Sequence, residues 1–196
     1  MQQKSSPRSN QDRTNATRSK LLDAARILFA EKGYAETSTP EIVRAAGVTR
    51  GALYHHFDDK EALFRAVLTV EFEAVAAEIT ASAKAGHSSS IDALKHGSRG
   101  YLKAMKDLGR VRIMLRDGPA VLGQVALDQI DQDTSAGALK TGLSAAMEAG
   151  EIGELPIDAL TTQLSALFDR AALAVAEGAN PKEHLKVLDA IFASLR

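Results

Sequence analysis

The chain has 196 residues, of which 45% are hydrophobic and 25% charged, with a formal net charge of -1 and no cysteine. This length holds one large domain, or a small module joined to a larger one. The lack of cysteine excludes disulfides and thiolate metal sites. The sequence contains no run of about 18 apolar residues, so no membrane-spanning helix is expected. We therefore expect a cytoplasmic protein with no membrane partner.

The charge is unevenly distributed along the chain. Residues 1–57 contain nine Lys or Arg and five Asp or Glu, whereas residues 58–196 contain fifteen and twenty. A basic end on an acidic body predicts that a polyanion binds locally, near the N-terminus. A chance distribution of charge is the alternative.

The first 17 residues are polar and include Lys4, Arg8 and Arg13. They can bury too little apolar surface to offset the entropy of ordering, so residues 1–17 are expected to be a disordered basic arm. Such an arm either adds weak phosphate contacts or is only a tail.

Helical patterns begin at Arg18. The first helix carries Leu21, Ala25 and Phe29 on one face and ends at Gly33. A second helix begins at Ser38 or Thr39 and ends at Gly47. A third begins at Thr49, whose hydroxyl can cap it, and ends near Phe57. The tight turn at Gly47 and Val48 makes the second and third helices a helix-turn-helix.

The rest of the chain is also helical by pattern. Asp58 is expected to cap a long fourth helix, over about 59–84. Five further helices are expected over 91–108, 111–116, 124–149, 156–177 and 181–195. The sequence thus predicts an all-α fold of about nine helices. It comprises an N-terminal three-helix domain at 18–65, whose helix-turn-helix predicts DNA binding, and a C-terminal helical bundle at 66–196.

The outward face of the third helix suits a DNA major groove. Its residues are Arg50, Gly51, Ala52, Tyr54 and His55. A helix that enters a groove about 12 Å wide needs short side chains and polar groups that reach base edges. Arg50 is alternatively a solvated surface charge, Tyr54 a partly buried core residue, and Gly51 a tolerated surface glycine.

Five segments of the N-terminal region resemble the tetracycline-repressor (TetR) family of transcription regulators. They are residues 21–25, 28–34, 37–43, 46–48 and 51–63. The resemblance implies that Arg50 and Ala52 contact bases and that the backbone at Gly51 comes close to DNA. It further implies phosphate contacts by Thr39, Tyr54 and Lys60, with His55 beside Tyr54.

The same resemblance implies a two-fold dimer formed by the last two helices. Both carry wide apolar stripes, which alternatively face only the core of their own subunit. The residues expected at the dimer interface are Leu164, Leu167, Phe168, Ala171, Val175, Leu188, Ile191 and Phe192.

The central bundle is expected to hold a small-molecule effector. Gly97, Gly100, Gly137 and Gly142 allow either tight helix packing or an internal cavity. The residues expected to contact the effector are His96, Tyr101, Met105, Arg112, Met114 and Phe168, each of which is alternatively plain core or surface. Asp169 and Arg170 anchor a polar ligand group or, alternatively, form an intersubunit ion pair.

No enzyme, metal or cofactor is expected. His55 and His56 lie about 100° apart on a helix and cannot converge on one ion, and no catalytic motif appears. We expect a homodimeric repressor that binds a palindromic operator in double-stranded DNA and is released by a small molecule. The alternatives are a small-molecule binding module whose helix-turn-helix no longer reads DNA, and a DNA-binding regulator with no effector.

Overall fold

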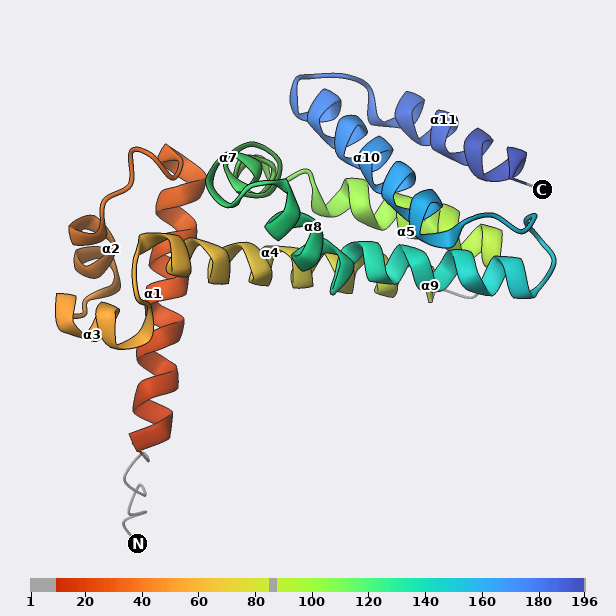
Figure 1. Cartoon of the computed structure of the whole chain (residues 1–196). Helices are drawn as coiled ribbons and strands as arrows, with labels where there is room; N and C mark the ends of the chain where they lie inside the picture. Colours follow the sequence, from red (N-terminus) through yellow and green to blue (C-terminus); the bar gives the residue numbers. More distant parts are fainter. Residues whose placement is uncertain (1–9, 85–87, 196) are drawn as a thin grey trace, which may run out of the picture. The chain divides into compact units, whose positions relative to one another are not determined.

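The computed structural model describes residues 10–84 and 88–195, and over these ranges it contains helices and no strand (Figure 1). The predicted all-α class is confirmed. Eleven α-helices and one π-helical segment are described, against about nine helices expected. In chain order they are α1 (Asn10–Lys32), α2 (Thr39–Ala46), α3 (Arg50–His56), α4 (Lys60–Ala83), α5 (Ser90–Ala104), α6 (Leu108–Val111), η1 (Arg112–Asp117), α7 (Gly118–Leu122), α8 (Gln124–Gln132), α9 (Ser135–Glu148), α10 (Ile157–Ala176) and α11 (Pro181–Ser194).

The chain divides into two compact units, each with its own core, and the division falls within α4, between Val67 and Leu68. The boundary expected from the sequence, between residues 65 and 66, lies two residues earlier. None of the helices in the described ranges is long and apolar enough to cross a membrane.

The core of the N-terminal unit draws on all four of its helices. Phe29 of α1, Ile42 of α2, Leu53 of α3 and Phe64 of α4 are fully buried. The rings of Phe29 and Phe64 meet edge to face, with their centroids 5.2 Å apart, a favoured aromatic geometry. This packing fixes the crossing of α2 and α3 against α1.

Helix α1 begins at Asn10, so the expected disorder is wrong over residues 10–17. These residues are mostly exposed and are supported by local bonds. The Gln11 amide donates to Asn15 at 3.2 Å and the Thr17 hydroxyl donates to the Arg13 carbonyl at 2.9 Å. Extending an existing helix needs no new nucleus, so no buried face is required there. Residues 1–9 of the expected arm lie outside the described residues.

In the C-terminal unit α5 packs against α9, α10 and α11, and α9 packs against α10 (Figure 1). Helix α5 also lies close to the second half of α4. A Cβ atom on Gly100 would lie 2.7 Å from the carbonyl oxygen of Glu78. Gly100 is therefore needed for tight helix packing, one of the two roles expected for these glycines.

Two of the expected helices are interrupted. The helix expected over 124–149 breaks into α8 and α9, because the Asp131 carboxylate accepts the Ala136 amide at 3.1 Å and the Thr134 hydroxyl donates to the Ile130 carbonyl at 2.6 Å. The helix expected over 91–108 ends at Ala104. The segment expected to be a short α-helix over 111–116 is mostly the π-helical turn η1.

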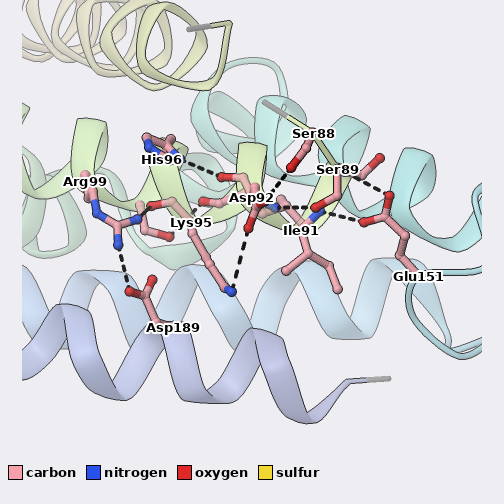
Figure 2. Close-up of polar contacts among 12 residues, drawn as sticks. Ser88, Ser89, Ile91, Asp92, Lys95, His96, Arg99, Glu151 and Asp189 are labelled. Carbon is pink, nitrogen blue, oxygen red and sulfur yellow. Dashed lines mark hydrogen bonds and ion pairs between the residues drawn. The ribbon is translucent and has the colours of Figure 1, made fainter. Parts of the chain in front are cut away.

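The start of α5 is held by a distant carboxylate, shown in Figure 2. Glu151, in the loop after α9, accepts the amides of Ser90 and Ile91 at 3.0 and 2.9 Å. These two hydrogen bonds lower the pKa of Glu151. Further along α5, Arg99 pairs with Asp189 of α11 at 2.7 Å. The two contacts fix the start and the second half of α5 to neighbouring elements.

Candidate DNA interface and effector pocket

The turn between α2 and α3 has the geometry expected of a helix-turn-helix. Gly47 adopts the left-handed conformation, with φ 63°, and its amide donates to the Arg44 carbonyl. The Thr49 hydroxyl accepts the Ala52 amide at 3.2 Å, so the predicted cap at Thr49 is confirmed. Both features are local, and together they set where α3 begins.

The first turn of α2 is fixed by Glu41. Its carboxylate accepts the amide and the hydroxyl of Ser38 at 3.0 and 2.9 Å and pairs with Lys32 at 2.7 Å. The hydrogen bond from Lys32 and those from Ser38 lower the pKa of Glu41 to about 2. The carboxylate therefore stays ionised at neutral pH and holds Thr39 at the start of the helix.

Three of the residues expected to contact DNA come together: Thr39 of α2 with Arg50 and Tyr54 of α3. The guanidinium carbon of Arg50 lies 5.5 Å from the centroid of the Tyr54 ring. Hydrogen bonds from Arg50 and Thr39 to the phenol oxygen lower the pKa of Tyr54. Arg50 and Tyr54 are exposed, whereas Thr39 is half-buried, so the cluster offers a guanidinium and a phenol to solvent.

Gly51 lies on the same exposed face, and the fold does not require a glycine there. A Cβ atom at this position would have one neighbour within 4 Å, the Thr49 hydroxyl at 3.9 Å. Ala52 is half-buried and His55 is exposed. The His55 ring packs edge to face against His56, at 5.3 Å between centroids. The face thus carries small side chains beside Arg50 and larger ones toward the end of α3.

Lys60 is engaged within its own domain. Its ammonium donates to the backbone carbonyls of Tyr34 and Thr37 at 2.9 and 3.0 Å and lies 4.0 Å from the centroid of the Tyr34 ring. It ties the start of α4 to the loop between α1 and α2, a role that sequence reasoning missed. A phosphate contact by Lys60 stays a prediction.

The cap of α4 differs from expectation by one residue. Asp59, rather than Asp58, accepts the Ala62 amide, at 2.7 Å, and α4 begins at Lys60. Because a carboxylate suits the positive end of a helix at either position, the sequence pattern alone does not separate the two.

The C-terminal unit contains a pocket of about 80 Å³ among α4, α5, η1, α8, α9 and α10. Of the residues expected to contact an effector, Tyr101, Met114 and Phe168 line it. Met114 reaches it from η1, where the wider π-helical turn interrupts regular helix. The apolar walls of the pocket are completed by residues from α4, α5 and α9, among them Phe72, Ile79, Ala83, Leu94, Ala138 and Leu139.

The other three residues expected at the effector do not line this pocket. Met105 is buried elsewhere in the core. His96 is exposed on the outer face of α5, with its Nδ1 2.8 Å from the Asp92 carbonyl oxygen (Figure 2). Arg112 is half-buried in the first turn of η1. An effector contact by these three residues stays a prediction.

Two carboxyl groups border the pocket. The Tyr101 hydroxyl donates to Asp169 at 2.6 Å, and Asp131 lies at the end of α8. Burial, and the charge of Asp169, raise the pKa of Asp131 to about 7, while burial raises that of Asp169 to about 6. Asp169 was expected as a polar anchor, and Asp131 was missed. Arg170 is exposed and does not line the pocket.

The expected dimer interface needs correction. Five of its residues, Leu164, Phe168, Ala171, Leu188 and Phe192, are buried within the core of a single chain, at most 7% exposed. They are therefore not available to a partner.

The remaining three residues of that set differ in exposure. Leu167 is 43% exposed, whereas Val175 and Ile191 are half-buried. Val187 of α11, which the prediction omitted, is 58% exposed.

Over the described residues, no three His, Cys, Asp or Glu gather as a metal site.

Comparisons with known proteins agree along most of the chain. Residues 21–67 match the model of bacterial regulatory proteins of the tetR family, and residues 91–195 match the tetracyclin repressor-like C-terminal domain. The HTH-type transcriptional repressor AcnR of Corynebacterium glutamicum is 31% identical, over 94% of this chain and 95% of its own. An HTH-type transcriptional repressor of Mycobacterium tuberculosis is 27% identical, over 97% and 98%.

A solved structure extends this agreement to the fold. The TetR-family transcriptional regulator of Pectobacterium atrosepticum is 30% identical, with a TM-score of 0.73 over 96% of this chain and 95% of that one. The expected resemblance is confirmed in both halves of the chain. The chain belongs to the TetR family and is a DNA-binding transcription regulator, not an enzyme.

Proposed function

We propose that this chain is a cytoplasmic repressor that binds a roughly palindromic operator as a homodimer and leaves it when a small molecule enters the pocket of the C-terminal unit. The observation that carries the proposal is the cluster of half-buried Thr39 with exposed Arg50 and Tyr54 across α2 and α3. Two relatives are named repressors, which supports repression rather than activation of transcription.

Each member of the cluster has a chemical role at the DNA. The planar guanidinium of Arg50 can donate two hydrogen bonds to O6 and N7 of a guanine, a contact that gives about 1–3 kcal/mol of discrimination between bases. The hydroxyls of Thr39 and Tyr54 suit phosphate oxygens, which position the protein without reading sequence. Gly51 lets the backbone of α3 come close to the floor of the groove.

Dimerisation supplies the second helix-turn-helix, which reads the other half of the operator. One helix-turn-helix reads only a few base pairs, whereas a two-fold dimer places two of them about 34–36 Å apart, one turn of the duplex. Leu167 of α10 and Val187 of α11 are large apolar side chains left exposed by the single chain. They support an interface on the outer faces of these two helices.

The effector step follows from linkage. A ligand that releases the protein from DNA must bind more tightly to the conformation that does not hold DNA, and such coupling is typically about 1–3 kcal/mol. The pocket bordered by Tyr101, Met114 and Phe168 is the site that supports this role, because it combines apolar walls with a few polar groups.

The test begins with purified protein and a labelled duplex from the region upstream of its own coding sequence, titrated at several salt concentrations. We expect binding that weakens steeply as salt rises, since phosphate contacts displace counterions. Arg50→Ala should relax the preference at one base pair, and Thr39→Ala should weaken binding to all duplexes alike. Failure to select any duplex from a random pool would favour a binding module without a DNA role.

A further inference from the structure

Three of the hydroxyl groups that line the pocket donate their protons to acceptors within the chain. The hydroxyl of Ser98 donates to the Leu94 carbonyl at 3.0 Å, and that of Ser135 to the Phe72 carbonyl at 3.4 Å. Tyr101 donates to a carboxylate at 2.6 Å. These three groups therefore present lone pairs, and not hydrogens, to anything that enters.

The remaining polar side chains of the pocket are Ser165 and the carboxyls of Asp131 and Asp169. One oxygen of Asp131 accepts the Ala136 amide at 3.1 Å, and one oxygen of Asp169 accepts the Tyr101 hydroxyl. In the described part of the chain no Lys, Arg or His lines the pocket. Burial raises the pKa of both carboxyls because no cation compensates their charge.

A neighbouring groove continues the same electrostatic character outward. It shares Asp131, Ser165 and Asp169 with the pocket, so these three residues stand where the two meet. Its other titratable residues are Asp128, Asp133, Asp158 and Lys140. The Lys140 ammonium pairs with Asp158 at 2.6 Å, so the groove keeps an acidic balance that attracts cations.

We propose that the effector is a compact organic cation, a protonated amine whose ammonium group lies between Asp131 and Asp169. Its hydrocarbon end would occupy the apolar part of the pocket beside Phe72, Leu94 and Phe168. This inference rests on the proposed effector role of the pocket and specifies the chemistry of the ligand. The volume of about 80 Å³ suits an apolar end of about three or four carbons, since benzene occupies an engineered cavity of about 150 Å³.

The other ligand classes fit this chemistry less well. A carboxylate or phosphate would be repelled by the two carboxyls and would find no donor among Ser98, Tyr101 and Ser135. Above about pH 7, where both carboxyls are ionised, a neutral apolar molecule would leave their charge without compensation, which is costly. An ammonium supplies three donors and a positive charge, which are what the pocket lacks.

Three probes with matched tails test the proposal on the full-length protein without DNA: n-butylammonium, n-butanol and butanoate. Binding is followed by NMR titration at pH 8 and constant ionic strength. We expect n-butylammonium to bind at least about tenfold more tightly than n-butanol, and butanoate not to bind. At pH 6 the preference should shrink, because Asp131, facing Asp128, Tyr101 and Asp169, takes up a proton.

Two variants locate the effect. The double substitution Asp131→Asn with Asp169→Asn keeps both acceptor oxygens and should abolish the preference for the ammonium. Asp133→Asn, in the groove but outside the pocket, is the matched control and should keep it. Equal binding of n-butanol and n-butylammonium, tighter binding of butanoate, or an ammonium preference that survives in the double variant would overturn the proposal.

Adding a DNA readout separates this inference from the proposed function. If n-butylammonium binds through Asp131 and Asp169 and also weakens operator binding, both stand. If it binds there and leaves operator affinity unchanged, the ligand class stands and the effector role of the pocket falls. If it does not bind while the protein still selects an operator, the ligand class falls and the DNA-binding role stands.

Discussion

Arg50 and Tyr54 lie one turn apart on α3, with the guanidinium carbon of Arg50 5.5 Å from the centroid of the Tyr54 ring. A guanidinium over an aromatic face is held by the ring's negative potential. The hydrogen bond from Arg50 to the phenol oxygen restricts it further. The arginine is thus oriented before DNA arrives, and less side-chain entropy is lost when it binds a base.

Tyr54→Phe should separate the two functions of this tyrosine. The ring remains for Arg50 to stack on, while the hydroxyl expected to meet phosphate is lost. We expect the affinity for all duplexes to fall by about tenfold, as for the loss of one hydrogen bond to a charged group. The preferred bases should stay the same, because the ring still holds Arg50 after its hydrogen bond to the hydroxyl is lost. Competition between matched and mismatched duplexes measures this, and a changed base preference would contradict it.

Gly51→Ala should affect DNA binding without harming the fold. The structure leaves space for a Cβ atom at this exposed position, and alanine favours a helix over glycine by up to about 1 kcal/mol. We expect an unchanged or higher melting temperature together with weaker operator binding. A variant that binds the operator as tightly as the wild type would show that the glycine is not needed for close approach to DNA.

The sequence predicted those features that local chemistry determines. The Thr49 cap, in which the hydroxyl accepts the Ala52 amide at 3.2 Å, depends on residues only three positions apart. The apolar stripe of α10 was also recognisable. Periodicity does not say which neighbour covers a stripe, however, so Leu164 and Phe168 were assigned to a partner although they pack within one chain.

The features that could not be predicted join residues far apart in the sequence. Lys60 reaches the carbonyls of Tyr34 and Thr37, and Glu151 reaches the amides that begin α5. In the sequence, Asp131 looks like any polar residue of an exposed helix. It borders the pocket because the helix expected over 124–149 is interrupted after α8. No local pattern marks such residues, because their role depends on which elements meet.

Lys60→Met should lower the stability of the protein. The substitution keeps most of the aliphatic chain but removes the ammonium that donates to the Thr37 carbonyl and one of the two donors to the Tyr34 carbonyl, which also accepts the Thr37 amide at 3.3 Å. An unsatisfied, partly buried acceptor costs about 1–3 kcal/mol, so the free energy of unfolding should fall by about that amount in urea denaturation. Lys20→Met, on the exposed side of α1, is the control. A salt slope of DNA binding that also falls by about one would support the predicted phosphate contact.

Leu167→Glu and Val187→Glu should weaken self-association. Both side chains are exposed in the single chain, by 43% and 58%, so the folded subunit tolerates a charge there, whereas an apolar interface does not. We expect light scattering to show monomers at micromolar concentration and operator affinity to fall. Val125→Glu, at a position that is 86% exposed on α8, should leave the dimer intact. Dimers that persist in both substituted proteins would place the interface elsewhere.

Asp131→Asn should change how stability depends on pH. Burial and the charge of Asp169 raise the pKa of Asp131 to about 7, whereas an unfolded aspartate titrates near about 3.9. The folded chain therefore holds the proton more tightly than the unfolded chain does. The contribution of this carboxyl to stability is fully present below about pH 4 and is lost as the pH rises through about 7.

The asparagine variant does not titrate, so its advantage over the wild type should grow with pH. One unit of pKa corresponds to about 1.4 kcal/mol, and about 1 kcal/mol moves the melting temperature of a chain of this size by about 2–4 °C. We expect the melting temperature of Asp131→Asn, relative to the wild type, to be at least about 3 °C higher at pH 8 than at pH 5. Asp133→Asn, at an exposed position, should show no such trend. If the difference in melting temperature between Asp131→Asn and the wild type stays constant from pH 5 to pH 8, Asp131 is ionised throughout this range. Its charge between α8 and α10 would then be compensated by another group.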